Sequence, residues 1–206
     1  MCIRDSYTGP KGRINRRLQA LIYEDSGAAK ALDKRQQPPG MHTRFRRPSN
    51  YGAALMEKQK IKHFYGLGER QLRRYFDKAT RQKGNTGENL LLLCEQRLDN
   101  VVRKVGLAKT RPQARQGVAH GHFLVNGQKV DRPSFMVRIG DVISVRPRKN
   151  VLQMYQKIRE MGVEGEGCEW VGFDSEKLTA TVQGKPSGSD ISLPVDANTV
   201  VEFLSR

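Results

Sequence analysis

The sequence predicts an α+β fold: a helical N-terminal domain with an extended basic arm, then a small α/β module of two helices and a short antiparallel sheet. Two observations carry this prediction. Apolar residues recur with helical spacing over 49–96. Beyond them, a helix pair is followed by short β-branched runs between turn residues. We expect four segments: a basic arm over 1–50, a helical domain over 51–96, the module over 97–161, and a β-rich part over 162–206 that returns to the helical domain.

The arm is polar, basic and rich in turn residues, among them Gly9-Pro10 and Pro38-Pro39-Gly40. Apart from a short helix expected around 16–23, its apolar periodicity is poor. We therefore expect an extended segment that becomes ordered on its partner. Residues 1–6 (MCIRDS) read unlike the chain that follows. We attribute them to a cloning or sequence-assembly scar and leave them out of functional reasoning.

Helices are expected over 49–65, 68–83 and 85–96 in the helical domain. Ser49 or Asn50 is the expected N-cap of the first, because both side chains can accept a backbone N–H. Asn85, with Glu88 three residues later, gives the third a start that resembles a capping box. Glycines at 66 and 84 end the first two helices.

The module begins with helices over 97–106 and 110–121, the second capped by Thr110. Asn126-Gly127 between two short apolar runs predicts a β-hairpin over 123–130. The remaining elements follow from alternation and turn residues. They are a strand pair at 137–139 and 142–145, a helix over 151–161, and strands at 170–173, 178–182 and 191–193. The apolar run 200–204 is ambiguous.

The net charge of +16 and the pI near 10.1 point to a polyanionic partner. The charge is uneven, at +13 over 1–83, +8 over 84–160 and −5 over 161–206. Arginine and lysine clusters alternate with aromatic residues such as Phe45 and Tyr75, as expected of a phosphate-binding surface. A compact helix pair with a hairpin favours folded RNA over DNA.

An enzyme is not expected, because the sequence lacks the common nucleotide-binding, metalloprotease and hydrolase motifs. We accordingly predict no cofactor and no small-molecule substrate. His120 and His122 have no third or fourth ligand nearby, so we expect RNA-facing or turn residues instead of a metal site. The three cysteines are far apart and fit a reducing cytoplasm. The apolar runs are far shorter than the ~20 residues that span a bilayer, so no membrane partner is expected.

The side chains expected to bind RNA are the cations, amides, imidazoles and one exposed aromatic of these clusters. They are Lys11, Arg13, Arg44, Arg46, Arg47, Tyr51, Lys58, Lys60, Lys62, Arg70, Arg73, Arg74, Lys83, Arg97, Arg111, Arg115, Gln116, His120, His122, Asn126 and Lys129.

Several strings resemble the small-subunit ribosomal protein S-four family of bacteria and organelles. The longest is KGNTGENLLLLCEQRLDNVV at 83–102. Others are YTGP at 7–10, PGMH at 39–42, GHFLVNG at 121–127 and EFLSR at 202–206. The resemblance covers nearly the whole chain. Many family members bind zinc through four cysteines near the N-terminus, but 12–37 contains none here, so no zinc is expected.

The resemblance implies a cytoplasmic protein of the small ribosomal subunit. It would bind 16S ribosomal RNA at a multi-helix junction of the 5′ domain and help nucleate assembly. Expected neighbours are ribosomal protein S-five, at an interface tied to decoding accuracy, other small-subunit proteins, and messenger RNA near Arg44, Arg46 and Arg47. The alternative is a free RNA-binding factor with the same module. The long basic segment 7–83 favours the ribosomal protein. Modification enzymes and a tRNA synthetase also carry the module, but they add a catalytic domain that is not found here.

Overall fold

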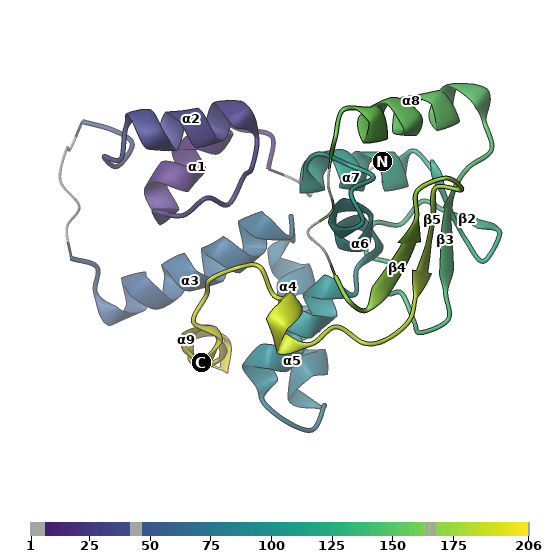
Figure 1. Ribbon diagram of the computed structural model, residues 1–206. Coiled ribbons are helices and arrows are strands. Elements are labelled where there is room, and N and C mark those ends of the chain that lie inside the picture. The colour runs from purple at the N-terminus through teal and green to yellow at the C-terminus, as the bar shows by residue number, and fades with distance from the viewer. Residues whose placement is uncertain (1–6, 42–46, 164, 166–167, 206) are drawn as a thin grey trace. The chain divides into compact units, whose positions relative to one another are not determined.

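The fold is described from a computed structural model, which describes residues 7–41, 47–163, 165 and 168–205. The predicted site residues Arg44 and Arg46 lie outside these described residues, as does the segment 1–6. The chain divides into two units, each considered by itself: unit 1 (Met1–Leu90 with Leu193–Arg206) and unit 2 (Leu91–Ser192). Helices of unit 1 and an antiparallel sheet in unit 2 confirm the predicted α+β class (Figure 1).

Residues 11–34 are largely helical, although the sequence predicted mostly extended chain. α1 (Lys11–Leu18) and α2 (Ser26–Lys34) pack against each other (Figure 1). The turn between them depends on Asn15, whose side chain is fully buried. Its amide oxygen accepts the N–H groups of Ile22 and Tyr23 at 3.1 and 3.0 Å, and its amide nitrogen donates to the Tyr23 carbonyl at 3.0 Å. These bonds satisfy backbone groups that burial removes from water.

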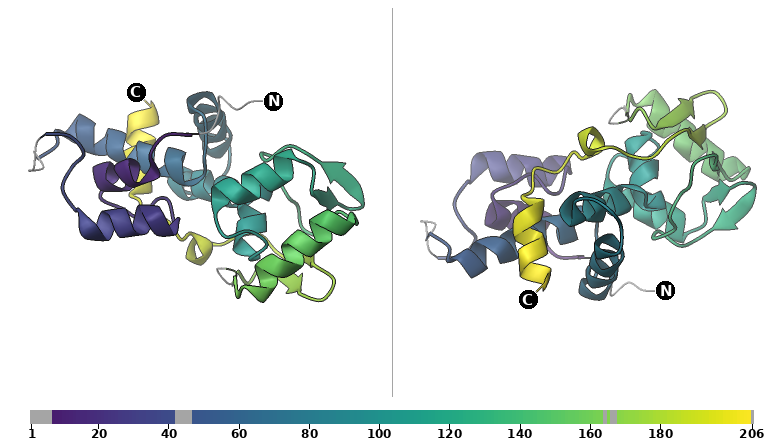
Figure 2. Two further views of the ribbon diagram at one scale, coloured as in Figure 1. Left: turned by 90° about the horizontal axis from the view of Figure 1, so that it is seen from above. Right: turned by 90° about the horizontal axis from the view of Figure 1, so that it is seen from below.

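The helices α3 (Asn50–Phe64), α4 (Glu69–Thr80) and α5 (Thr86–Glu95) lie where the sequence predicts them. Ser49 caps α3, accepting the N–H of Gly52 at 3.2 Å. The ambiguous final run forms α9 (Ala197–Ser205), which packs against α3 and α4 (Figures 1 and 2). Leu72 and Val200 are fully buried in this packing region.

Unit 2 is built on a five-stranded sheet with the order β2-β1-β3-β5-β4, in which each neighbouring pair is antiparallel. Its strands are β1 (Phe123–Val125), β2 (Gln128–Val130), β3 (Val142–Val145), β4 (Val171–Asp174) and β5 (Thr179–Val182). One face shares a hydrophobic core with α6 (Leu98–Lys104), α7 (Arg111–Ala119) and α8 (Lys149–Glu160). Asn126 and Gly127 both have positive φ, 51° and 79°, as the predicted two-residue hairpin turn requires.

The C-terminal quarter is shared between the units, whereas the sequence predicted that 162–206 returns to the helical domain as one part. Strands β4 and β5 extend the sheet of unit 2, and only Leu193–Arg206 belongs to unit 1. Pairing of Ile143 with Ala180 explains this division, because without β5 that edge of β3 would keep unpaired backbone groups.

Two predicted strands do not form. In the segment 137–139, the neighbouring Met136 makes a single bridge to Arg97 and no strand develops. The run 191–193 follows a 3-10 turn, η2 (Gly188–Asp190), and pairs with no strand of the described sheet.

Candidate RNA interface

The exposed side of α4 carries a dense group of cations. Leu72, Tyr75 and Ala79, spaced three or four residues apart, are buried and fix which side of the helix faces inward. The opposite side consequently faces water. It presents Arg70, Arg73, Arg74 and Lys78, and Arg81 follows at the helix end. We call these five residues the α4 face. Guanidinium groups bind phosphate through paired bonds, so this face is suited to an RNA backbone.

The lysines predicted on α3 are held in ion pairs within unit 1. Lys58 is 7% exposed and bonds Glu69 at 2.7 Å, and Lys62 reaches the same carboxylate at 3.3 Å. Lys60 pairs with Glu57 at 2.6 Å. Burial opposes ionisation of Glu69, but the hydrogen bonds and charges of Lys58 and Lys62 outweigh it and lower the pKa of that carboxyl. Lys58 therefore supports the surface from within, whereas the half-buried Lys60 and Lys62 remain partly accessible despite their ion pairs.

The remaining predicted residues of unit 1 differ in exposure. Lys11 pairs with Asp25, and its ammonium lies 5.8 Å from the centre of the Tyr23 ring. Tyr51 is 60% exposed and lies beside Phe203 of α9, with 5.3 Å between ring centres. Three further predicted cations are exposed: Arg13, Arg47 and Lys83.

In unit 2, predicted residues gather where α7 meets β1. His120 and His122 have ring centres 5.8 Å apart. The Lys129 side chain crosses over Gly121, which stands between the two histidines, and Gln116 lies one helical turn before His120. Arg115, whose side chain is 20% exposed, belongs to the same helix. We call Arg115, Gln116, His120, His122 and Lys129 the α7–β1 surface.

A close contact beneath this surface fixes the orientation of His122. Gly117 of α7 lies so near Tyr155 that a Cβ at this position would be 2.5 Å from the phenol oxygen. That oxygen is 3.2 Å from His122 Nδ1. Burial, then the charges of His120 and Arg148, lower the pKa of His122. The imidazole is therefore mostly neutral near pH 7 and can donate or accept a hydrogen bond toward RNA.

Arg97 and Arg111, both predicted to bind RNA, are buried in a polar network instead. Arg97 is fully buried and makes two bonds to Asp99, at 3.0 and 2.6 Å. Arg111 is 9% exposed and donates to Asn100 at 3.0 Å and to Ser192 at 3.3 Å. Burial of a charge requires such partners. We therefore leave both arginines out of the RNA-contacting surface.

The same network supports the surface above it. Asn100 donates to Glu95 at 2.5 Å, and Glu95 pairs with Lys104 at 2.9 Å. Arg115 reaches Asp99 at 3.5 Å, so one carboxylate serves both a buried arginine and a partly exposed one. This connection orients Arg115 at the edge of the α7–β1 surface.

Asn126 has an internal role in the hairpin. Its side-chain amide donates to Asp141 at 2.8 Å, and its oxygen accepts the N–H of Val142 at 2.9 Å. Because Asn126 is still exposed at the turn, any contact it makes with RNA would use its remaining hydrogen-bonding capacity.

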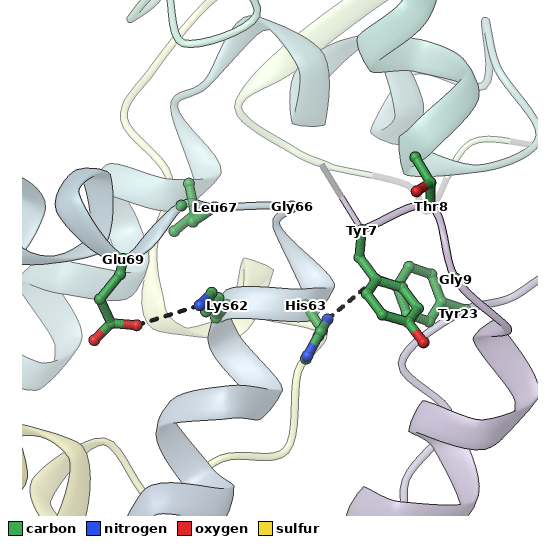
Figure 3. Close-up of a pocket in the computed structure, with 10 residues that line it drawn as sticks. Tyr7, Thr8, Gly9, Tyr23, Lys62, His63, Gly66, Leu67 and Glu69 are labelled. Carbon is green, nitrogen blue, oxygen red and sulfur yellow. Dashed lines mark hydrogen bonds and ion pairs between the residues drawn. The ribbon is translucent and has the colours of Figure 1, made fainter. Parts of the chain in front are cut away.

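Unit 1 also contains an aromatic pocket of about 550 Å³ that the sequence did not suggest (Figure 3). Tyr7, Tyr23 and His63 form one wall, and Lys62 with the 66–69 segment forms another. The Tyr23 hydroxyl is 3.2 Å from His63 Nδ1. Tyr23 and His63 are 40 positions apart in the sequence. Local periodicity does not predict contacts between segments so far apart, so the sequence alone could not indicate this pocket.

Within the described residues, no three His, Cys, Asp or Glu side chains lie together in a way that could hold a metal ion. Of the helices in that same part of the chain, none has the length and apolar character needed to cross a membrane.

Two family models match this chain. A family model described as Ribosomal protein S4/S9 N-terminal domain matches residues 6–95, and one described as S4 domain matches residues 96–143. Together they cover more than half of the chain.

Similar proteins extend over nearly the full length. A relative from Rhodopirellula baltica is 67% identical over 200 residues, which are 97% of this chain and 98% of the relative. One from Rubrobacter xylanophilus is 46% identical, with 97% and 98% covered. Both are named small ribosomal subunit protein uS4. The chain therefore belongs to the uS4 family, whose members are structural, RNA-binding constituents of the small ribosomal subunit and not enzymes.

Proposed function

We propose that this protein binds 16S ribosomal RNA directly, at a multi-helix junction of the 5′ domain, and helps nucleate assembly of the small subunit. The observation that carries the proposal is the α4 face, where four exposed cations occupy one side of a single helix and Arg81 continues them. The α7–β1 surface supplies imidazole and amide groups suited to structured RNA.

The RNA-contacting residues that we propose are the exposed and half-buried members of the predicted set. In unit 1 they are Lys11, Arg13, Arg47, Tyr51, Lys60, Lys62, Arg70, Arg73, Arg74 and Lys83, and in unit 2 Arg115, Gln116, His120, His122, Asn126 and Lys129. Lys58, Arg97 and Arg111 support these surfaces from buried positions.

Binding to a 5′-domain fragment of 16S ribosomal RNA tests the proposal. We expect tight binding whose affinity falls steeply as salt is raised, because each neutralised phosphate releases counterions. A random RNA of the same length is the control. Equal affinity for both RNAs would contradict site-specific binding.

We further propose that ribosomal protein S-five is a neighbour and that the pair contributes to decoding accuracy. The net charge of −5 over 161–206 supports a protein neighbour for this part, since it would repel RNA. Among its exposed acids are Asp174, Glu176 and Glu202. Cross-linking within purified small subunits would test this proposal. Cross-links from residues 161–206 to ribosomal protein S-five would support it, and cross-links from this part to RNA alone would contradict it.

Messenger RNA near its point of entry is proposed as a third contact, through Arg47 together with Arg44 and Arg46. Only Arg47 lies among the described residues, and it is exposed. Co-sedimentation with small subunits separates the ribosomal role from that of a free RNA-binding factor. A chain that remains at the top of the gradient, apart from the subunits, would favour the free factor.

A further inference from the structure

The pocket of unit 1 has an aromatic wall with one ring left open to solvent. Tyr23 is 7% exposed, whereas Tyr7 is 37% exposed. Their rings are stacked, with 6.3 Å between centres and 29° between planes, and the edge of His63 meets Tyr7 at 5.3 Å. Tyr7 thus packs against both Tyr23 and His63 and still keeps part of its side chain exposed. Burial of this exposed part would remove further apolar area from water.

The Tyr7 ring is held in place before any partner arrives. Its hydroxyl donates to the Pro10 carbonyl at 3.4 Å, and the ring folds back over Gly9, where a Cβ would lie 2.6 Å from the phenol oxygen. A side chain that is already ordered loses less conformational entropy when it binds.

The rim of the pocket is suited to an anion. Lys62 lines it and pairs with Glu69, the acid in the lining (Figure 3). Glu69 is also paired with Lys58. Burial first, then the positive charges of Lys62 and Arg17, lower the pKa of His63. The first turn of α4 begins at the same rim, and its N-cap, Gly68, has no side chain to occupy the free N–H groups.

We propose that this pocket holds one unpaired nucleotide of the bound RNA, with its base packed on the exposed part of the Tyr7 ring and a phosphate at the rim near Lys62. The proposal rests on the proposed RNA-binding function. A volume of about 550 Å³ suits one nucleotide, since pockets for small ligands span roughly 300–1,000 Å³. An aromatic platform beside cations is the usual means by which proteins bind unstacked bases.

Substitutions at Tyr7 test the stacking. Tyr7→Leu removes the aromatic face and should weaken binding to the 5′-domain RNA about ten- to hundredfold. Tyr7→Phe keeps the ring and should stay within about threefold of the wild type. Equal losses in both variants would overturn the proposal, as would wild-type affinity in Tyr7→Leu. Circular dichroism and thermal melting of each variant show whether the fold is kept.

A fluorescent reporter places the base directly. Trp170 is the single natural tryptophan and is 4% exposed in unit 2, so the wild type gives the background signal. In Tyr7→Trp, the RNA should quench the added emission, because a stacked base quenches indole. Full binding without quenching would overturn the pocket as a nucleotide site.

Two controls distinguish a nucleotide of the RNA from a free nucleotide, and failure of the pocket proposal from failure of the proposed function. Adenosine monophosphate at millimolar concentration should leave the emission of Tyr7→Trp unchanged. Saturable quenching by it would assign the pocket to a free nucleotide and overturn the RNA proposal. If the wild type itself does not bind the 5′-domain RNA, the proposed function fails. If the wild type binds and only the Tyr7 predictions fail, the pocket alone is wrong.

Discussion

Two arginines share one carboxylate at Asp99, and their surroundings decide what each can do. Arg97 is fully buried against Asp99, whereas Arg115 reaches the same group from a partly exposed position. A buried cation without its partner is far more costly than an exposed one. Arginines that look alike in the sequence therefore differ in role: Arg97 stabilises the fold, whereas Arg115 remains partly accessible to a partner.

Replacement of Arg97 by Ala should lower the free energy of unfolding by about 3–5 kcal/mol, because Asp99 would remain buried without its main partner. Urea denaturation measures the change. Arg73→Ala is the matched control: its side chain is exposed on α4, and its effect should stay within about 0.5 kcal/mol. Similar losses in the two variants would contradict the assigned role of the network.

His63 should make stability depend on pH. Burial, with Lys62 and Arg17, lowers its pKa from 6.5 in the folded chain, while the unfolded chain keeps the ordinary value. Between these values the unfolded chain binds more protons, so the free energy of unfolding falls as pH drops below about 6.5. Above that pH the imidazole is neutral in both states, so His63 adds no further pH dependence to the free energy of unfolding.

The variant His63→Gln should show a weaker fall of stability between about pH 7 and pH 5, since glutamine does not titrate there. Urea denaturation at several pH values measures it. His122, whose pKa is also lowered, contributes with the same sign, so its slope should persist in the variant. Identical pH dependence in wild type and variant would rule out the contribution of His63.

The burial of Arg97 and Arg111 could not be predicted from the sequence. Arg97 could have been suspected, because Asp99 follows two positions later, but spacing alone does not tell a buried pair from an exposed one. Arg111 gave no such local sign, since its partners include Ser192, 81 positions away. Contacts of that range depend on tertiary packing, which local periodicity does not report.

At the scale of elements, α4 is the part of the candidate RNA interface that the sequence predicts best. Its apolar spacing predicted a helix, and the same spacing settles which side faces water, so the exposed cations follow from the sequence. The N-terminal helix pair did not follow, because its turn depends on the buried side chain of Asn15. Nor did the place of β4 and β5, which is determined by pairing with β3.

Neutralising the α4 face should change how RNA binding depends on salt. With Arg70, Arg73 and Arg74 replaced by Gln, three phosphate contacts are lost, and the slope of log affinity against log salt should become shallower by about 2–3. Lys177→Gln is the control, because this lysine is exposed in the acidic C-terminal quarter. An unchanged slope in the triple variant would place the phosphate contacts elsewhere.

For the molecule as a whole, the absence of cysteine from 12–37 predicts that folding does not depend on zinc. Metal analysis of the purified protein should find zinc well below one ion per chain. EDTA should leave the melting temperature unchanged, because a structural zinc site would lose stability with its metal. Stoichiometric zinc, or a lowered melting temperature in EDTA, would contradict this.

The division of the chain into units has a consequence for synthesis. Unit 1 is assembled from Met1–Leu90 and Leu193–Arg206, so α9 reaches α3 only after all of unit 2 has been translated. At about 5–20 residues per second, that interval lasts on the order of 5–20 s. Small domains commonly fold within seconds or faster, so the sheet of unit 2 has time to form first. The packing of unit 1 is complete only when α9 has been synthesised. In a chain whose synthesis stops before α9, the side of α3 that α9 covers stays exposed and accessible to chaperones and proteases.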